Sequence, residues 1–288
     1  MLAQLICPGH PQSRLELEPG AQIDKDGAIW RGRLCCTAPK ASYTVDQGIV
    51  DFIGSWDLPT SPAQLVNYLA PTAWVYERAW RPHALTLLSG EPFGYDRELP
   101  LISQLMALEQ GGLYLDVACS NGLYARALSR ALSAVPGQSH VVGVDYSLPM
   151  LRQAQVFAQR EKLSISYIRA KAQGLPFRDG SIDGVMMGGS LNEIGDVDAC
   201  LREIRRVLTR SGRCFIMNLI QVEHPVGRAF QAFLGVGGVA FWTLEELNRR
   251  FRYNGLILKA QWRYGAVVFT LLVPAPVLAP ANPVEVMP

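Results

Sequence analysis

Two aspartates stand at the ends of short apolar runs that are typical of buried strands. Asp116 lies near the end of the run 113–117, and Asp145 follows the run 140–144. In an open α/β sheet, ligands bind at the carboxyl ends of the strands. A carboxylate there can accept hydrogen bonds from both hydroxyls of a ribose, so we predict this role for Asp145 rather than a helix N-cap or a solvated strand end. Asp116 is predicted to meet a polar ligand group or to stay solvated.

A turn of small residues, 118–122 (ACSNG), separates the first of these runs from a helical pattern. A dinucleotide would require the spacing GxGxxG, because its pyrophosphate must approach bare backbone at the helix start. Ala118, Ser120 and Leu123 occupy those three positions, so the dinucleotide fingerprint is absent. S-adenosylmethionine carries no phosphate and requires a close turn for its methionine part, an acid for its ribose and a shelf for its adenine. The pattern therefore favours S-adenosylmethionine.

The elements that must position these residues alternate regularly from residue 111 onward. Period-two and period-3.6 apolar patterns predict a parallel, doubly wound sheet. The predicted strands are 113–117, 140–144, 164–168, 181–187 and 213–218, and the predicted helices are 122–133, 148–161, 196–208 and 243–252. Two further strands, 255–261 and 266–273, form a hairpin across the link 262–265, which adds an antiparallel strand. The predicted fold is α/β with a mostly parallel, seven-stranded sheet.

Three further segments surround this unit of residues 111–273. Residues 1–55 are predicted to form a separate, small, β-rich unit in which 43–53 is a strand. Residues 56–110 form a helical cap, and 274–288 form a proline-rich tail that is disordered or loosely docked. If the cap lies over the ligand edge, Tyr76, Arg78 and His83 become candidate site residues, although Trp74, Tyr76 and Trp80 equally suit packing.

Four segments in the same order resemble a known family. They are LDVACSNG, GVDYSLPML, LPFRDGSIDGV and LREIRRVLTRSGRCFI. The resemblance is to class I S-adenosylmethionine-dependent methyltransferases with a type 11 methyltransferase domain, closest to the ubiquinone/menaquinone C-methyltransferase branch. YERAWRPHAL and the cysteine-bearing start look like a plastid and cyanobacterial subset. The resemblance covers about residues 60–273.

The resemblance implies a role for each matching position. The loop around the methionine moiety comprises Asp116, Ala118, Cys119, Ser120 and Gly122. Asp145 is the ribose-binding acid, with adenine flanked by Tyr146 and Met150 and its edge received by Ala172 and Gln173. Gly188 and Gly189 form the floor beneath the transferred methyl group.

The chain departs from the family pattern at four positions. Two family glycines are Ala118 and Ser120, which narrow the turn. Lys171 stands where the family often has an acid, and an ammonium cannot accept a hydrogen bond from adenine. The position that often carries a histidine falls near Asn192.

Methyl transfer from a sulfonium is mostly a matter of alignment, and a base helps when the acceptor is a phenol or a hydroquinone carbon. Glu193 and His224 follow the fourth and fifth strands and are the candidate catalytic residues, although both positions also suit ordinary exposed loops. The apolar, glycine-rich segment 224–242 is predicted to be either a mobile lid over a lipophilic acceptor or a surface packed on the cap.

Four residues near the N-terminus raise the question of zinc. Cys7 and His10 form a CxxH pair, and Cys35 and Cys36 follow later. A zinc ribbon normally separates its second pair of ligands by two residues. Because Cys35 and Cys36 are adjacent, we predict no metal here.

Composition excludes some classes of function. A net charge of +2 is too small to favour nucleic acid or an acidic membrane surface. The arginines on and after helix 196–208 are predicted to be a solvated face rather than a phosphate site; they are Arg202, Arg205, Arg206, Arg210 and Arg213. Six scattered cysteines, no recognisable signal peptide and no long apolar run favour a soluble, cytoplasmic protein with reduced thiols.

The predicted function is methyl transfer to a small, hydrophobic acceptor of quinone or isoprenoid type, with peripheral membrane contact as one further expectation. Two other hypotheses stay open. One is a ribosomal RNA base methyltransferase with a degenerate zinc ribbon, which the near-neutral charge opposes. The other is a methyltransferase-like binding protein without catalysis, which Ala118, Ser120 and Lys171 keep open. The oligomeric state is not predicted.

Overall fold

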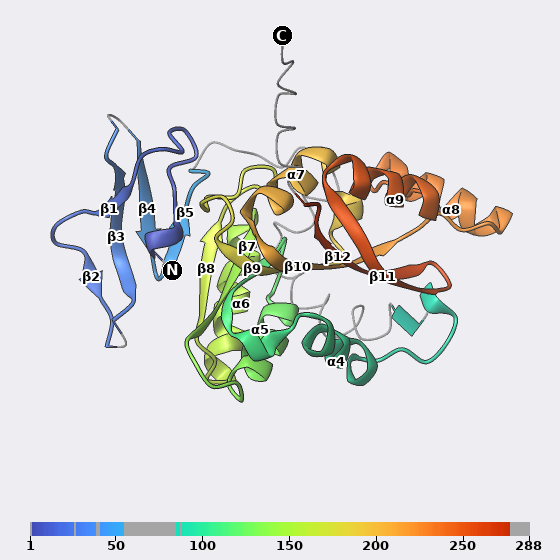
Figure 1. Cartoon of the computed structure of the whole chain (residues 1–288), viewed down its shortest axis with the longest axis horizontal. Coiled ribbons are helices and arrows are strands. Elements are labelled where there is room, and N and C mark those ends of the chain that lie inside the picture. The colour runs from blue at the N-terminus through green and yellow to red at the C-terminus, as the bar shows by residue number, and fades with distance from the viewer. Residues whose placement is uncertain (1, 26, 39–40, 55–84, 87, 277–288) are drawn as a thin grey trace, which may run out of the picture.

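A computed structural model describes residues 2–25, 27–38, 41–54, 85–86 and 88–276 of the chain (Figure 1). Its central sheet has the strand order β8-β7-β6-β9-β10-β12-β11. These strands are β6 (Gly112–Val117), β7 (Ser139–Asp145), β8 (Ile165–Arg169), β9 (Ile182–Gly188), β10 (Leu208–Leu219), β11 (Leu256–Tyr264) and β12 (Val267–Pro274). Strands β6 to β10 pair in parallel, and β12 is antiparallel to both its neighbours. The predicted fold class is confirmed.

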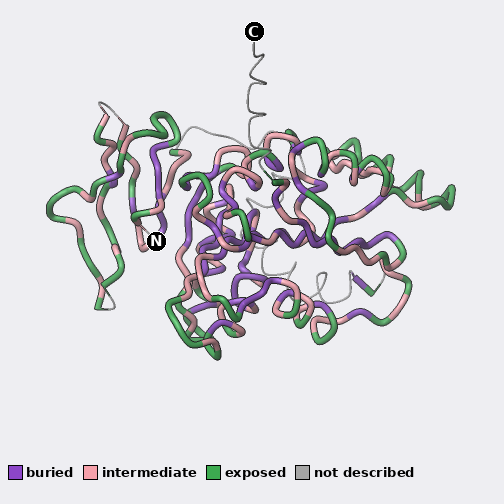
Figure 2. The backbone as a smooth tube through the Cα atoms, viewed as in Figure 1, coloured by how far each residue is buried: buried purple, intermediate pink, exposed green. Residues whose placement is uncertain are grey.

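Helices cover both faces of this sheet (Figure 1). They are α4 (Tyr95–Leu105), α5 (Leu123–Leu132), α6 (Leu148–Arg160), α7 (Val197–Val207), α8 (Pro225–Val236) and α9 (Leu244–Tyr253). Alternate residues of β6 point to opposite faces: Leu115 and Val117 pack in the cluster that includes α7 and α9, whereas Tyr114 packs in the cluster that includes α4 and α5. In Figure 2 the central strands are mainly buried.

The chain order reverses between β6 and β9. Strands β7 and β8 are added on one side of β6, and β9 and β10 on the other. This is the topological switch point of a doubly wound sheet, where ligands bind beyond the carboxyl ends of the strands. The loop after β6 lies at this point, as the sequence predicts.

The N-terminal strands continue the central sheet and are not separate from it. They are β1 (Leu15–Leu17), β2 (Gln22–Ile23), β3 (Ile29–Cys36), β4 (Ser42–Asp46) and β5 (Ile49–Asp51). Strand β5 pairs in parallel with β8, so that twelve strands form one sheet. The segment 43–53 is a hairpin rather than one strand, because Gln47 (φ 49°) and Gly48 (φ 78°) make a tight turn between β4 and β5.

Several predicted boundaries were wrong near turns. Strand β10 begins at Leu208, before the predicted residue 213, and its pairing with β9 shifts between these two positions. In the last hairpin, pairing continues to Tyr264 opposite Val267. The turn is therefore formed by Gly265 (φ 56°) and Ala266 rather than by 262–265. These boundaries were wrong because an alternating apolar pattern does not show at which residue the pairing of two strands begins or ends.

Some predictions fall outside the described residues. These concern Trp74, Tyr76, Arg78, Trp80 and His83 of the helical cap and the tail from residue 277. Within the described part of the cap, α4 packs through Ile102 against the core, and Tyr124 of α5 belongs to the same cluster. Among the described residues, no helix is both long and apolar enough to span a bilayer.

Candidate functional site

The loop after β6 has a left-handed backbone at alternate residues. Ala118 (φ 54°), Ser120 (φ 50°) and Gly122 (φ 77°) all have positive φ. Only glycine adopts this conformation without a steric cost, which is roughly 1 kcal/mol or more for other residues. Ala118 and Ser120 therefore adopt the backbone conformation that favours glycine, at an energetic cost. The backbone of the loop does not change to avoid this cost.

The carboxylate of Asp145 contacts this loop directly. One carboxylate oxygen accepts a hydrogen bond from the backbone N–H of Ser120 at 2.7 Å, and the other accepts one from the N–H of Ser147 at 2.8 Å. Burial raises the pKa of Asp145, and the hydrogen bonds from these N–H groups oppose that rise. The structure thus brings together the acid after the second strand and the turn after the first.

Asp116 is not solvated, so one of its two predicted environments is excluded, and its role in the loop around the methionine moiety stays a prediction. Asp116 is a residue of β6 and is only 1% exposed. One oxygen of its carboxylate accepts a hydrogen bond from the N–H of Ala125 at 2.8 Å. The pKa of Asp116 is raised to about 7, mainly by burial; the hydrogen bond from Ala125 opposes this rise and the charge of Asp145 adds to it. The carboxyl group fastens the first turn of α5 to the strand.

Further contacts position the side chains after Asp145. Met150 is buried in α6, and its sulfur lies 3.5 Å from the Ser120 hydroxyl. Arg169, at the end of β8, donates a hydrogen bond to the carbonyl of Tyr146 at 3.0 Å. The guanidinium also lies 5.9 Å from the Tyr146 ring centre and pairs with Asp51 of β5 at 2.9 Å.

The contribution of Arg169 and Asp51 was missed from the sequence. The one sequence feature that could have indicated this pair is that each residue ends a strand, as Asp145 does. The N-terminal strands therefore support the site through a buried ion pair.

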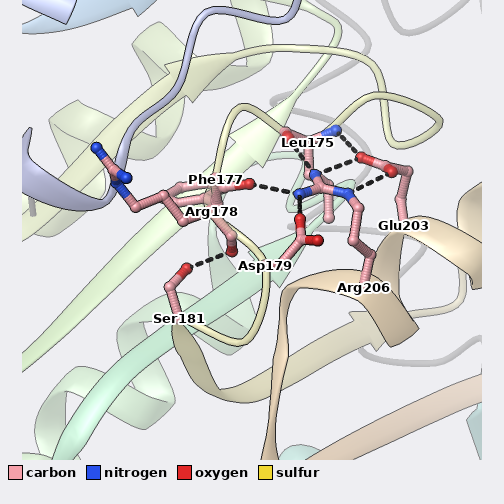
Figure 3. A network of polar contacts seen from close by, with 7 residues as sticks. All are labelled: Leu175, Phe177, Arg178, Asp179, Ser181, Glu203 and Arg206. Carbon is pink, nitrogen blue, oxygen red and sulfur yellow. Dashed lines mark hydrogen bonds and ion pairs between the residues drawn. The ribbon is translucent and has the colours of Figure 1, made fainter. Parts of the chain in front are cut away.

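The segment of Ala172 and Gln173 follows β8 as a half-buried loop, with Lys171 exposed before it. The N–H of Ala170 donates to the carbonyl of Asp145 at 3.1 Å, so the loop begins beside the acid. After the loop, Arg206 of α7 holds the chain at Leu175 (Figure 3).

Arg206 is at the centre of a polar network (Figure 3). Its guanidinium binds both carboxylate oxygens of Glu203, at 2.7 and 2.8 Å, and one oxygen of Asp179 at 2.7 Å. It also donates to the carbonyls of Leu175 and Phe177. The hydrogen bonds and charges of Glu203 and Asp179 raise the pKa of Arg206, against the effect of its burial. Arg206 therefore acts as an internal anchor and not as part of a solvated face.

Gly188 ends β9 under an aromatic ring. A Cβ at this position would lie 2.9 Å from the ring of Tyr124, so only glycine fits without displacing it. The Tyr124 hydroxyl donates a hydrogen bond to Glu98 of α4, a carboxylate that is fully buried. Sequence reasoning missed this pair, because Glu98 follows Asp96 and Arg97 in the first turn of α4 and looks like part of an exposed, charged helix start.

Asn192 has a structural role in this chain. It lies in the short helix η4 (Leu191–Glu193), and its amide group binds the N–H and the carbonyl of Leu219 as well as the carbonyl of Ala240. These bonds join the end of β10 to the segment before α9. Glu193, the next residue, is half-buried, and His224 is exposed at the N-cap of α8. Their catalytic roles stay predictions.

The segment predicted as a lid contains the helix α8, which is largely exposed (Figure 2). Val226, Phe230 and Phe233 are 71%, 58% and 72% exposed, and Val236 is 85% exposed. The first three recur at intervals of four and three residues, so they share one helix face. An apolar face of this kind on the surface is unusual and marks an interaction site.

Comparison with known proteins places this geometry in a family. Residues 115–216 match the methyltransferase domain family. An uncharacterized chloroplastic methyltransferase of Arabidopsis thaliana is 31% identical over 199 residues, which are 66% of this chain and 54% of that protein. A 2-phytyl-1,4-naphtoquinone methyltransferase of Nostoc punctiforme is 32% identical over 127 residues, which are 43% of this chain and 54% of that protein. The chain thus spans about half the length of these curated relatives.

A solved structure supports the fold independently. The crystal structure of a SAM-dependent methyltransferase from Aquifex aeolicus superposes with a TM-score of 0.53, at 15% identity, over 70% of this chain and 97% of that one. At this identity the similarity concerns the fold alone. The family match and the relatives show that residues 115–216 form a methyltransferase domain, of the class I, S-adenosylmethionine-dependent type.

Proposed function

We propose that this protein transfers a methyl group from S-adenosylmethionine to a small, hydrophobic acceptor of quinone or isoprenoid type. The observation that carries the proposal is the contact between the Asp145 carboxylate and the N–H of Ser120. It sets an acid and a tight, small-residue turn side by side at the switch point of the sheet. A nucleoside with a methionine chain requires this combination.

The residues around Asp145 fit this cofactor. A carboxylate has about four acceptor sites, and the N–H groups of Ser120 and Ser147 take one each, so capacity remains for a ribose hydroxyl. Tyr146 and Met150 supply an aromatic ring and a thioether for the adenine. When bound, S-adenosylmethionine supplies a methyl group that its positive sulfonium has already activated.

The remaining catalytic work is alignment and proton removal. Gly188, without a side chain, lets the Tyr124 ring pack closely against the end of β9, and a ring fixed in this way favours one orientation of the reactants. We assign Glu193 or His224 as the group that takes the proton released by the acceptor, because they follow β9 and β10 at the same edge of the sheet. A positioned base of this kind contributes about 10²- to 10⁴-fold.

The segment after β10 supports a hydrophobic acceptor. Helix α8 presents Val226, Phe230 and Phe233 on one exposed face, and the relative from Nostoc punctiforme is a naphthoquinone methyltransferase. We propose that this face contacts the acceptor or the lipid surface in which such an acceptor dissolves, which makes the protein a peripheral membrane enzyme.

The test is incubation of the full chain with S-adenosylmethionine labelled at the methyl group and, in parallel, with a lipid extract or total RNA. We expect label in the lipid pool and identify the labelled molecule by mass spectrometry. Incorporation into RNA alone would overturn the choice of acceptor. If calorimetry shows no binding of the donor, the protein is a methyltransferase-like binding protein, and the proposal fails as a whole.

A further inference from the structure

Three metal-binding side chains converge at the N-terminal end of the sheet. The Cys7 sulfur, the His10 Nδ1 and the Cys36 sulfur all lie within 4.8 Å of one another. His10 Nδ1 is 3.7 Å from the Cys7 sulfur and 3.8 Å from the Cys36 sulfur. Around tetrahedral zinc, with bonds of about 2.3 Å to sulfur and about 2.0 Å to nitrogen, neighbouring ligand atoms are roughly 3.5–3.8 Å apart. The two distances therefore match the edges of a zinc site.

The backbone holds these residues in place by contacts of its own. The N–H of His10 donates to the carbonyl of Cys7 at 3.0 Å, which closes a tight turn. Cys36 ends β3, where it pairs with Leu15 of β1. The N–H of Ile6, next to Cys7, donates to the carbonyl of Pro176 at 3.1 Å. Because both segments are fixed, little reorganisation is required to bind an ion.

The register of β3 separates the two adjacent cysteines. Neighbouring residues of a strand point to opposite faces, so only Cys36 can reach the side of Cys7 and His10, while Cys35 is directed away. The prediction of no metal rested on the adjacency of the two cysteines, and it did not consider that one of them alone could join the CxxH pair.

The surroundings of Cys7 suit a thiolate ligand. Cys7 is fully buried, and the Tyr43 hydroxyl lies 3.1 Å from its sulfur. A hydroxyl next to a sulfur ligand is a common outer-shell partner of a metal site.

We propose that Cys7, His10 and Cys36 bind a zinc ion, with water at the fourth position. Two sulfurs and one imidazole nitrogen form a donor set that zinc prefers over magnesium or calcium. The ion would fasten the turn at residues 7–10 to the end of β3. It has a structural role, since Cys36 belongs to β3 near one edge of the sheet, and the strands β4, β5 and β8 separate it from β7, which ends at Asp145.

The full chain, purified without added metal and without a histidine tag, tests this proposal. Elemental analysis should find about one zinc per chain. With cobalt in place of zinc, the protein should show thiolate-to-cobalt absorption in the near ultraviolet and visible bands typical of tetrahedral cobalt. Zinc should also raise the melting temperature, because binding to the native state stabilises it.

The adjacent cysteines supply a matched pair of variants. Cys36→Ser should weaken zinc binding by about 100-fold in competition with a chromophoric chelator, whereas Cys35→Ser should change it less than about threefold. Circular dichroism checks that both variants fold. Wild-type protein that neither contains zinc nor gives the cobalt spectrum overturns the proposal. Equal losses in the two serine variants also overturn it, because they indicate unspecific binding to exposed thiols.

Discussion

The loops after β6, β7 and β8 are tied to one another by hydrogen bonds, whereas the segment after β10 turns apolar side chains to the solvent. On the first side, Asp145 binds Ser120, and Arg169 binds Tyr146. On the second side, α8 exposes Phe230 and Phe233. We call these regions the donor side and the acceptor side.

The contrast teaches what each side has to recognise. The donor side holds buried polar groups, which lose free energy unless their partners are fixed in advance. The acceptor side presents apolar side chains, and the free energy of an apolar contact depends on the buried area and little on its geometry. A preformed donor side and an open acceptor side are therefore what the proposed function, with one cofactor and a lipophilic acceptor, requires.

The largest effect is expected from breaking the donor side at Asp145. Asp145→Ala removes the acceptor for the ribose hydroxyls, and each hydrogen bond to a charged group is worth about 1.5–3 kcal/mol. Affinity for S-adenosylmethionine, measured by calorimetry, should fall by about 100-fold or more. Glu245→Ala, at a glutamate whose side chain is 82% exposed, is the control and should bind normally. An Asp145 variant with unchanged affinity would remove this residue from the site.

A charge introduced on α8 should weaken binding at the acceptor side and should not change the affinity for S-adenosylmethionine. Phe233→Asp removes an apolar contact worth about 1.5–3 kcal/mol. Its binding to phosphatidylcholine vesicles that contain a naphthoquinone, measured by sedimentation, should therefore fall by about tenfold or more. The control is Tyr253→Asp, at a residue of α9 that is 80% exposed. If both variants lose binding equally, α8 has no special role.

Asp116 gives the donor side a pH dependence. Its pKa is about 7 in the folded protein and about 3.9 in an unfolded chain. The native state therefore holds a proton that the unfolded state releases, and stability should fall as pH rises from about 4 to 7, by at most about 1.4 kcal/mol per unit.

The variant Asp116→Asn keeps an oxygen for the N–H of Ala125 but cannot ionise. Urea unfolding between pH 5 and 8 should show a flatter dependence of stability on pH than in the wild type. Glu245→Gln serves as the control and should leave the wild-type slope in place. Parallel curves for wild type and Asp116→Asn would show that Asp116 does not titrate in this range.

The smallest effect is expected at the turn itself. Ala118→Gly removes the cost of a positive φ but adds freedom to the unfolded chain, so stability should rise by less than about 1 kcal/mol. Ala125→Gly, at a helical position, should lower stability by about 1 kcal/mol or more. Thermal unfolding of the two variants separates these effects. Equal destabilisation would mean that position 118 does not prefer glycine.

The donor side was predictable because its signals are local. The strand, the small-residue turn and the acid after the next strand lie within one continuous segment, and the structure joins them as expected. The partner of Asp116 was missed, because a carboxylate inside a strand looks the same in sequence as one at its end. The helix Pro225–Val236 was also missed: its glycines and its apolar composition favoured a mobile segment, although Val226, Phe230 and Phe233 recur at helical spacing.

Contacts between segments that are far apart in the sequence could not be predicted, because they produce no local sequence pattern. The pairing of β5 with β8 joins residues 49–51 to 167–169 through backbone hydrogen bonds, which have no sequence signature. The choice of Cys36 over Cys35 depends on the register of β3, which no local motif fixes.

The bond between Arg169 and Asp51 has a consequence for any shortened form of this protein. A chain that starts after residue 54 would keep the whole methyltransferase domain, yet it would leave a buried guanidinium without its carboxylate, which is strongly destabilising. The same guanidinium supports the carbonyl of Tyr146. Proteolytic trimming at the front of the chain would thus disturb the loop at Tyr146, where we propose that the adenosine part of the cofactor binds, far along the sequence from the cut.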